Sequence, residues 1–478
     1  MTELKKFSFL HDIRFWILIF FIIRMAGITN PPLEVAHNWR QSTVAMVARN
    51  FYEVDNNILY PRIDIWGETT GITGMEFPLL NYMHYAVAEV FGYQHWYGRL
   101  INLIISSIGI FFFYRLIRKY FSERTAFSSA LILLVSIWLS YSRKIMPDTF
   151  SMSLIIMSIY YGSNYLDGNQ KRVMNLILFV VFFALGALTK ITSAYLMIVF
   201  ALWIFSPKTD FHKKATFIAV GLLGLLPVSA LYFYWVPYLM ETYGVKHFFM
   251  GKDFLTGISE VFGDFPRFLN LFYEWTLKFV GFALFLLGIW YAIRQKQRAV
   301  LWLLFLTFLA FMVVAFRAGE TFLHHVYYMI PFAPVMAFIA GFGLSKIPNR
   351  TLATVLLAAV AVEGVANQWG DYRIKEESRF LINIETDLDQ WISRDDLIII
   401  NSNYIPTPMY FTHRKGRVMD NQRIRGRREM QNFYDMGYRY ILILKHSFGS
   451  DMELPRFELI TDNEDYRLYR IINDKTLE

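Results

Sequence analysis

Three ionisable side chains lie close together in the segment LEVAHNWRQST, residues 33–43. Glu34, His37 and Arg40 follow Asn-Pro-Pro, a typical helix start, and their spacing of three predicts that they lie near one face of a helix. A carboxylate beside an imidazole and a guanidinium can act as a general base or as a metal ligand. The alternative is an anchor at a membrane surface, but an anchor does not need a clustered acid and imidazole.

Two further acids of the first loop, Glu76 and Asp64, are candidate site residues. Glu76 in GMEFPLLNY precedes Pro78, so we expect it in extended backbone directly before a helix. An acid at the edge of an apolar stretch is costly unless it is paired or functional. Asp64 in PRIDIWGE is a candidate substrate-binding residue, although turn chemistry explains it equally well.

Cations accompany the next acid in SYSRKIMPDTF. Asp148 lies where a helix should begin, so it is either an N-cap or a functional acid. Arg143 and Lys144, beside this acid, could hold an anionic ligand. Lys190 in LTKITS either extends its ammonium toward the membrane surface or meets a lipid phosphate.

The later loops offer polar residues of weaker specificity. His324 and His325 stand in RAGETFLHHVYYMIPFAP, and Tyr243, His247 and Asp253 stand in or near an aromatic segment suited to stacking a sugar. We predict substrate contacts for these residues but no zinc site at the two adjacent histidines, because they should point to opposite faces. Walker, GxSxG, GxGxxG and HExxH patterns are absent from the sequence.

The composition indicates a membrane protein. Of the 478 residues, 55% are hydrophobic and 18% are charged, against about 25% charged in soluble proteins. The net charge of +8 is spread over short groups between apolar runs, which favours membrane orientation over nucleic-acid binding. There is no cysteine, so no disulfide frame exists.

The apolar runs predict about eleven membrane-spanning helices. Short basic loops alternate with them and are typical of the cytoplasmic side, which places the N-terminus in the cytoplasm. Residues 173–206 are too long for one straight span, so we expect a hairpin that turns at Lys190. The predicted spans are roughly 14–30, 97–119, 125–142, 149–166, 173–188, 191–206, 215–236, 273–293, 299–316, 327–345 and 350–367.

The C-terminal segment changes character. DLIIINSNYIP, YRYILILK and FELITD read as strands, and IETDLDQWISRDD and RREMQNFYDMG as helices between them. We therefore predict a transmembrane domain over 1–367, with outer loops at 31–95 and 237–272, and a small α/β extracytoplasmic domain over 368–478 with partly parallel strands.

Several segments together resemble a known family. They are HNWRQSTVAMVARNFY, YPRIDIWGETTGITGMEFPLLNY, YGRLIN, SRKIMPD, LTKITS and HHVYYMIPFAPVMA. In wording and order they are similar to the polyprenyl-phosphate-sugar-dependent glycosyltransferases of the GT-C fold, in particular the protein O-mannosyltransferase and lipid A aminoarabinose transferase group. The resemblance covers essentially the whole membrane part.

The resemblance implies an inverting transferase that takes a sugar from a lipid monophosphate on the outer leaflet. Glu34 fits the acid that deprotonates the acceptor or helps to bind a divalent metal, and His37 could share this work. Glu76 matches the acid before the family's proline and is a second tentative metal ligand. Asp148 matches the acid of the third outer turn, and Lys190 matches the lysine that meets the donor phosphate.

The sequence departs from this family at two points. Aminoarabinose transferases carry a lysine between the glutamate and the proline, where Phe77 stands here, so that phosphate contact must come from elsewhere, and Arg40 and Arg143 are the candidates. The first loop also has one acid rather than an Asp-Glu pair.

The expected function is thus a glycosyltransferase of the cytoplasmic (inner) membrane. Its expected partners are a polyprenyl-phosphate-linked sugar, an acceptor of unknown identity and membrane lipids, with a divalent cation as a conceivable cofactor and no nucleic acid. Two alternatives stay open. One is a transporter or flippase of lipid-linked sugars, which would place ionisable groups at mid-membrane and show internal repeats. The other is an enzyme like an O-antigen ligase or polymerase, which uses a diphosphate-linked donor.

Overall fold

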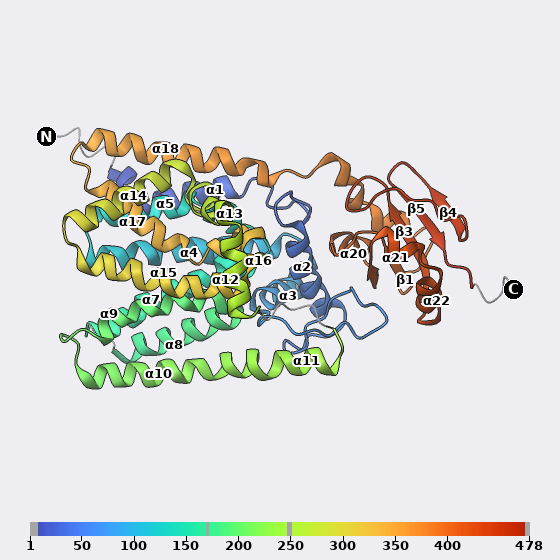
Figure 1. Cartoon of the computed structure of the whole chain (residues 1–478), viewed down its shortest axis with the longest axis horizontal. Coiled ribbons are helices and arrows are strands. Elements are labelled where there is room, and N and C mark those ends of the chain that lie inside the picture. Colours follow the sequence, from blue (N-terminus) through green and yellow to red (C-terminus); the bar gives the residue numbers. More distant parts are fainter. Residues whose placement is uncertain (1–7, 169–171, 246–250, 474–478) are drawn as a thin grey trace. The chain divides into compact units, whose positions relative to one another are not determined.

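The computed structural model describes residues 8–168, 172–245 and 251–473, and in it the chain divides into two compact units. The first, here the helical unit, comprises the described parts of 1–28, 99–234 and 249–370. The second, here the mixed unit, comprises the described parts of 29–98, 235–248 and 371–478. Figure 1 shows the helices and strands of both units with their labels.

The helical unit consists of helices joined by short turns. In chain order they are η1 (Ser8–His11), α1 (Ile13–Arg24), α4 (Tyr97–Tyr120), α5 (Glu123–Val135), α6 (Trp138–Tyr141), α7 (Pro147–Leu166), α8 (Arg172–Thr189), η2 (Ile191–Phe200), α9 (Ala201–Ile204), α10 (Phe211–Ser229), η3 (Ala230–Trp235), α12 (Phe254–Gly263), α13 (Phe265–Asn270), η4 (Leu271–Thr276), α14 (Lys278–Arg294), α15 (Arg298–Ala318), α16 (Glu320–His324), η5 (Val326–Met329), α17 (Ala333–Ser345) and α18 (Arg350–Gln368).

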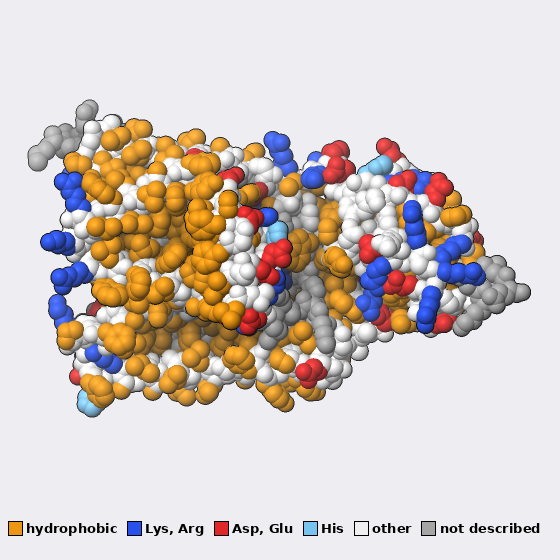
Figure 2. All heavy atoms as spheres, viewed as in Figure 1, with side chains coloured by type: hydrophobic (Ala, Val, Ile, Leu, Met, Phe, Trp, Pro, Cys, Tyr) orange, Lys and Arg blue, Asp and Glu red, His pale blue; other side chains and the backbone are white. Residues whose placement is uncertain are grey.

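Three helices form the centre of this unit. α5, α7 and α17 are buried over most of their length, and small residues let their neighbours approach closely. A Cβ added at Gly343 of α17 would lie 2.6 Å from the backbone nitrogen of Gly288 in α14. The outer helices expose apolar side chains instead, as Figure 2 shows for the visible face, where Lys and Arg gather at its left end. This pattern suits a helix bundle surrounded by lipid.

Each of the eleven predicted spans contains a helix. By length and composition, five helices of the described residues could cross a membrane, or six if the pair bent by 102° between 265–276 and 278–294 counts as one span. The chain is therefore a multi-pass helical membrane protein with a small sheet-containing part. The number of crossings and the side on which each loop lies remain predictions.

The mixed unit holds a five-stranded sheet and short helices. The strand order is β2-β1-β3-β5-β4; β1 pairs in parallel with β2 and β3, and β5 pairs antiparallel with β3 and β4. The elements are α2 (Asn38–Glu53), α3 (Leu79–Phe91), α11 (Val236–Thr242), η6 (Trp369–Tyr372), η7 (Glu376–Ile382), α19 (Ile384–Leu388), β1 (Leu397–Ile400), α20 (Thr407–Thr412), β2 (Gly416–Val418), α21 (Asn421–Arg425), α22 (Arg427–Asp435), β3 (Tyr438–Leu444), β4 (Glu458–Asp462) and β5 (Tyr466–Arg470).

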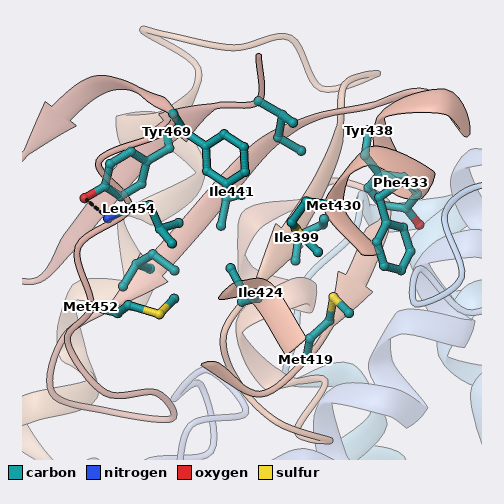
Figure 3. Packing of buried hydrophobic residues seen from close by; sticks show 13 residues of the cluster. Ile399, Met419, Ile424, Met430, Phe433, Tyr438, Ile441, Met452, Leu454 and Tyr469 are labelled. Carbon is teal, nitrogen blue, oxygen red and sulfur yellow. Dashed lines mark hydrogen bonds between the residues drawn. The ribbon is translucent and has the colours of Figure 1, made fainter. Parts of the chain in front are cut away.

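The core of the sheet is closed by α22 and by the segment before β4. Ile399 and Ile441 of the central strands pack with Met430 and Phe433 of α22, and the Tyr469 hydroxyl accepts the backbone N–H of Leu454 at 3.3 Å (Figure 3). The predicted partly parallel strands at β1, β3 and β4 are confirmed. β2 and β5 were not anticipated.

The first loop packs against this sheet within the mixed unit. Ile65 pairs in parallel with Gly416 of β2, whose carbonyl accepts the backbone N–H of Trp66 at 2.9 Å and of Gly67 at 3.0 Å. Glu68 accepts hydrogen bonds from Arg417 of β2 and from the Tyr438 hydroxyl of β3. The sequence predictions assigned this loop to the transmembrane domain, whereas its packing is with the C-terminal sheet.

Candidate functional site

Lys190 lies at a break between two helices of the helical unit. α8 ends at Thr189 and η2 begins at Ile191, with extended backbone between them, so the predicted interruption is confirmed. The Ser151 hydroxyl of α7 donates to the Gly186 carbonyl at 2.8 Å and to the Lys190 carbonyl at 3.4 Å. The Lys190 ammonium stands 3.2 Å from the Asp148 carboxylate, and its side chain is 14% exposed.

Asp148 lies in the first turn of α7 rather than at its cap. Met146 is the N-cap and Pro147 opens the helix, so the interpretation of Asp148 as only an N-cap is wrong. The Asp148 side chain is 3% exposed, and its Oδ1 faces Lys190. Its Oδ2 is buried and has no hydrogen-bond partner among the described residues. One carboxylate oxygen is thus available to a group that enters the site.

Two aromatic rings extend this pair toward the HHVYYM segment. The Lys190 ammonium lies 5.3 Å from the centre of the Tyr327 ring, a cation–π distance. The His325 ring stacks on the same tyrosine at 5.3 Å. Of the two adjacent histidines, His325 therefore joins the Lys190 group, whereas His324 contacts Glu320 at 3.3 Å on the exposed side of α16.

A buried cationic turn lies directly before α7. Arg143 and Lys144 are fully buried, and Asn102 of α4 donates to three carbonyls of the 141–146 turn at 2.9–3.2 Å. Arg143 also donates to the Gly27 carbonyl at 2.8 Å. Asn102 therefore fixes a non-helical turn that carries two cations, five and four residues before Asp148. Buried cations of this kind suit an anionic ligand.

Glu34 lies before α2 in the mixed unit. The predicted common helical face of Glu34, His37 and Arg40 is wrong, because α2 begins only at Asn38 and His37 is its N-cap in left-handed backbone. Glu34 forms an isolated antiparallel bridge with Ile374 and is fully buried. Its Oε1 lies 3.4 Å from the Asn30 amide nitrogen. A buried carboxylate in a non-helical turn fits the role of a base.

Arg40 and Glu76 form an ion pair in the same unit. Arg40 lies in the first turn of α2, and Glu76 lies in the extended segment before α3, as predicted. Their side chains are 13% and 3% exposed. Two of the predicted site residues are thus brought together. Arg40, which was predicted to contact the donor phosphate, instead pairs with Glu76 of the same unit.

Asp64 is held by two donors. Arg49 of α2 donates to its Oδ2 at 2.7 Å, and Asn50 donates to its Oδ1 at 2.8 Å. All three side chains are buried. Because both oxygens are occupied, Asp64 fixes the first loop to α2, and this arrangement favours the structural alternative over substrate binding.

The remaining candidates make other contacts. The ring centres of Tyr243 and Tyr60 lie 6.3 Å apart. Asp253 caps α12 by accepting the Thr256 backbone N–H at 3.1 Å. His247 lies outside the described residues.

The predicted metal ligands Glu34 and Glu76 are not part of a cluster of three potential ligands among the described residues. Among the residues that the structure describes, no three His, Asp or Glu side chains converge on a point that could hold an ion. The Glu76 carboxylate, moreover, is already balanced by Arg40. A metal at Glu34 or Glu76 remains a prediction, and we derive no step through it.

The comparison with protein families matches part of the chain. Residues 76–235 match the family described as dolichyl-phosphate-mannose-protein mannosyltransferase. This range contains Glu76, Arg143, Asp148 and Lys190. Among curated proteins, none matches the sequence significantly.

Solved structures with the same fold span the whole chain. The apo structure of ArnT from Cupriavidus metallidurans has a TM-score of 0.61 at 12% identity, covering 96% of this chain and 98% of that one. The same enzyme bound to undecaprenyl phosphate has a TM-score of 0.60 at 11% identity, with the same coverage. The oligosaccharyltransferase of Archaeoglobus fulgidus has a TM-score of 0.52 at 13% identity, covering 90% and 69%. The chain therefore has the GT-C fold, and the resemblance inferred from its sequence is confirmed.

The positioning residues were not found from the sequence. Asn102 and Ser151 are polar residues inside apolar helices, which is a signal for a buried hydrogen bond but not for its partner. Tyr327 stands in the quoted segment HHVYYMIPFAP, but no role was predicted for it. Their contacts depend on which helices become neighbours, and that information is not local.

Proposed function

We propose that this protein is a membrane glycosyltransferase that moves a sugar from a polyprenyl-phosphate donor to an acceptor. One observation carries the proposal: the buried pair of Lys190 and Asp148, beside the cationic 141–146 turn, in a helical unit that exposes apolar side chains. A donor with a prenyl tail and an anionic head needs a lipid-facing scaffold and buried cations. The match over 76–235 and the fold shared with the undecaprenyl-phosphate-bound ArnT structure support it.

The chemistry needs no nucleotide site. The leaving group is already a phosphate, so cations need only neutralise the charge that develops on it. Lys190, assisted by Arg143, supplies this function. Asp148 holds the ammonium in place and is a positioning residue. Glu34 acts as the base that removes a proton from the acceptor, and displacement at the anomeric carbon then inverts its configuration.

The orientation is part of the proposal. We place the first loop and the C-terminal sheet on the extracytoplasmic side of the inner membrane and the N-terminus in the cytoplasm. The basic loops between the predicted spans support this topology. A cysteine introduced at exposed Glu89 of α3 should react with a membrane-impermeant maleimide in intact cells. Labelling only after cell lysis would show that the first loop lies in the cytoplasm, opposite to the proposed orientation.

The activity is tested with the purified full chain and a panel of polyprenyl-phosphate sugars. Mass spectrometry of the lipid and of the acceptor should show release of the prenyl phosphate. Glu34→Gln should lose at least about 100-fold in turnover, the range for a positioned general base. Glu89→Gln, an exposed acid of the same loop region, is the matched control and should retain turnover.

Two results would argue against the proposal. Unchanged sugar lipid together with its exchange between leaflets of a vesicle would indicate a transporter. Turnover of a diphosphate-linked but not a monophosphate-linked donor would indicate a ligase or polymerase. Normal turnover of Glu34→Gln would remove Glu34 as the base while leaving the transferase assignment intact.

A further inference from the structure

A groove lies between α1 and α4 of the helical unit. Its polar end is a pocket of about 410 Å³ lined by Arg14 at the start of α1 and by Arg115 and Arg118 near the end of α4. Arg115 lies 13 residues after Asn102 on the same helix, which is about 20 Å along its axis. This pocket is therefore separate from the Lys190 site.

The groove continues as an apolar channel. A second hollow of about 440 Å³ shares Arg14 and Phe111 with the first, and its other lining residues are mainly apolar. Leu18 of α1 and Ile108 of α4 line it and are 57% and 40% exposed. The two hollows thus form one amphipathic groove, with guanidinium groups at one end and hydrocarbon along the rest.

The charges at the polar end are incompletely balanced. Three guanidinium groups and one carboxylate, Asp12, line the pocket, with His11 at its edge. Arg14 binds Asp12 at 2.5 Å, and Arg118 binds Glu123 at 2.6 Å.

Among the residues that the structure describes, no carboxylate forms an ion pair with Arg115. Its guanidinium carbon lies 4.7 Å from the centre of the Tyr160 ring and 5.9 Å from that of the Phe111 ring. Its side chain is exposed. A cation fixed by rings, with its N–H groups accessible, is a ready donor to an anion.

We propose that this groove binds one anionic phospholipid of the leaflet on that side, which is the cytoplasmic leaflet in the predicted orientation. Its phosphate accepts hydrogen bonds from Arg115 and Arg14, and an acyl chain lies along Leu18 and Ile108. Basic pockets between membrane helices favour anionic headgroups, and the adjoining apolar channel selects a lipid over a free anion. The bound lipid fastens α1 to α4.

The test uses the purified full chain in mixed micelles of phosphatidylglycerol and phosphatidylcholine in equal amounts. Native mass spectrometry measures the ratio of the two lipids retained. We expect phosphatidylglycerol to be preferred. Each basic residue near an anionic lipid contributes a factor of about five in affinity. Arg115→Gln should therefore reduce the preference for phosphatidylglycerol about five-fold, and the double variant Arg14→Gln/Arg115→Gln about 25-fold.

The matched control is Arg294, an exposed arginine at the end of α14 that lies 5.0 Å from the centre of the Trp290 ring. Arg294→Gln removes the same charge outside the groove and should leave the ratio unchanged. Ile108→Trp fills the apolar channel and should lower retention of phosphatidylglycerol with all cations intact. Equal losses in Arg115→Gln and Arg294→Gln would show general surface charge and overturn the proposal. So would full retention in Ile108→Trp, or displacement of the lipid by inorganic phosphate alone.

Discussion

Replacing Lys190 by methionine separates the two roles that this lysine can have. Asp148 is 3% exposed and, among the described residues, has Lys190 as its ion-pair partner at 3.2 Å. The single variant leaves a buried carboxylate without its counter-charge, and breaking a buried pair costs about 3–5 kcal/mol. The double variant Lys190→Met/Asp148→Asn removes both charges, so most of this loss should be recovered. Thermal unfolding of the purified protein measures both.

The donor KM provides the functional readout. A hydrogen bond to a charged group contributes about 1.5–3 kcal/mol, so loss of a phosphate contact should raise the donor KM about 10- to 150-fold. The double variant should regain stability but not the KM, because it still lacks the ammonium.

A second ion pair of the same unit serves as the control. Lys119 pairs with Asp167 at 2.6 Å, with side chains 20% and 27% exposed. Lys119→Met should lower stability without changing the donor KM. If the Lys190→Met/Asp148→Asn protein recovers both stability and KM, Lys190 makes no contact with the donor phosphate and the reasoning fails.

Two further predictions concern the mixed unit. The pKa of His413 is raised because its ring hydrogen-bonds Glu385 at 2.9 Å and Glu53 at 2.8 Å. A raised pKa stabilises the fold fully below the unfolded pKa of about 6.5, and this contribution is lost as the pH rises through the folded pKa, so the unfolding temperature should fall as the pH rises above about 6.5. His413→Asn, which keeps the left-handed backbone accessible, should flatten this profile; an unchanged slope would contradict the assignment. Asp64→Asn should cost about 3–5 kcal/mol in stability, because it leaves Arg49 buried without its acid, and a variant that unfolds like the wild type would show that the pair is not structural.

Local features of the fold were predictable from the sequence. A helix lies within each of the eleven predicted apolar runs, Pro78 and Pro147 precede or open helices, and the polar break LTKITS marked the interruption at Lys190. These signals depend on hydropathy, on the missing N–H of proline and on helix length, and all act within a few residues. The start of α2 was placed too early, because Asn-Pro-Pro signals a turn as readily as a helix.

Pairings between residues far apart in the chain could not be predicted from the sequence. Glu34 is bridged to Ile374, and Glu68 is bound by Arg417, each about 340–350 residues away in the chain. Neither pairing has a local signature. Removing the C-terminal sheet would therefore leave Glu34 and Glu68 of the first loop without these contacts. Loss of activity in a truncated protein would then not show that the acceptor binds to the C-terminal segment.

Hydrogen-bond satisfaction distinguishes the two buried acids that the sequence left ambiguous. Asp64 uses both oxygens, one for Arg49 and one for Asn50, so neither oxygen is left without a partner. Asp148 uses only Oδ1 toward Lys190, and its buried Oδ2 has no hydrogen-bond partner among the described residues. A buried polar atom without a partner is costly and is retained where function requires it. We therefore expect the Asp148–Lys190 pair to belong to a site that rearranges when an anionic lipid enters. The Asp64–Arg49 pair, whose carboxylate oxygens both have donors, is expected to belong to the structural framework.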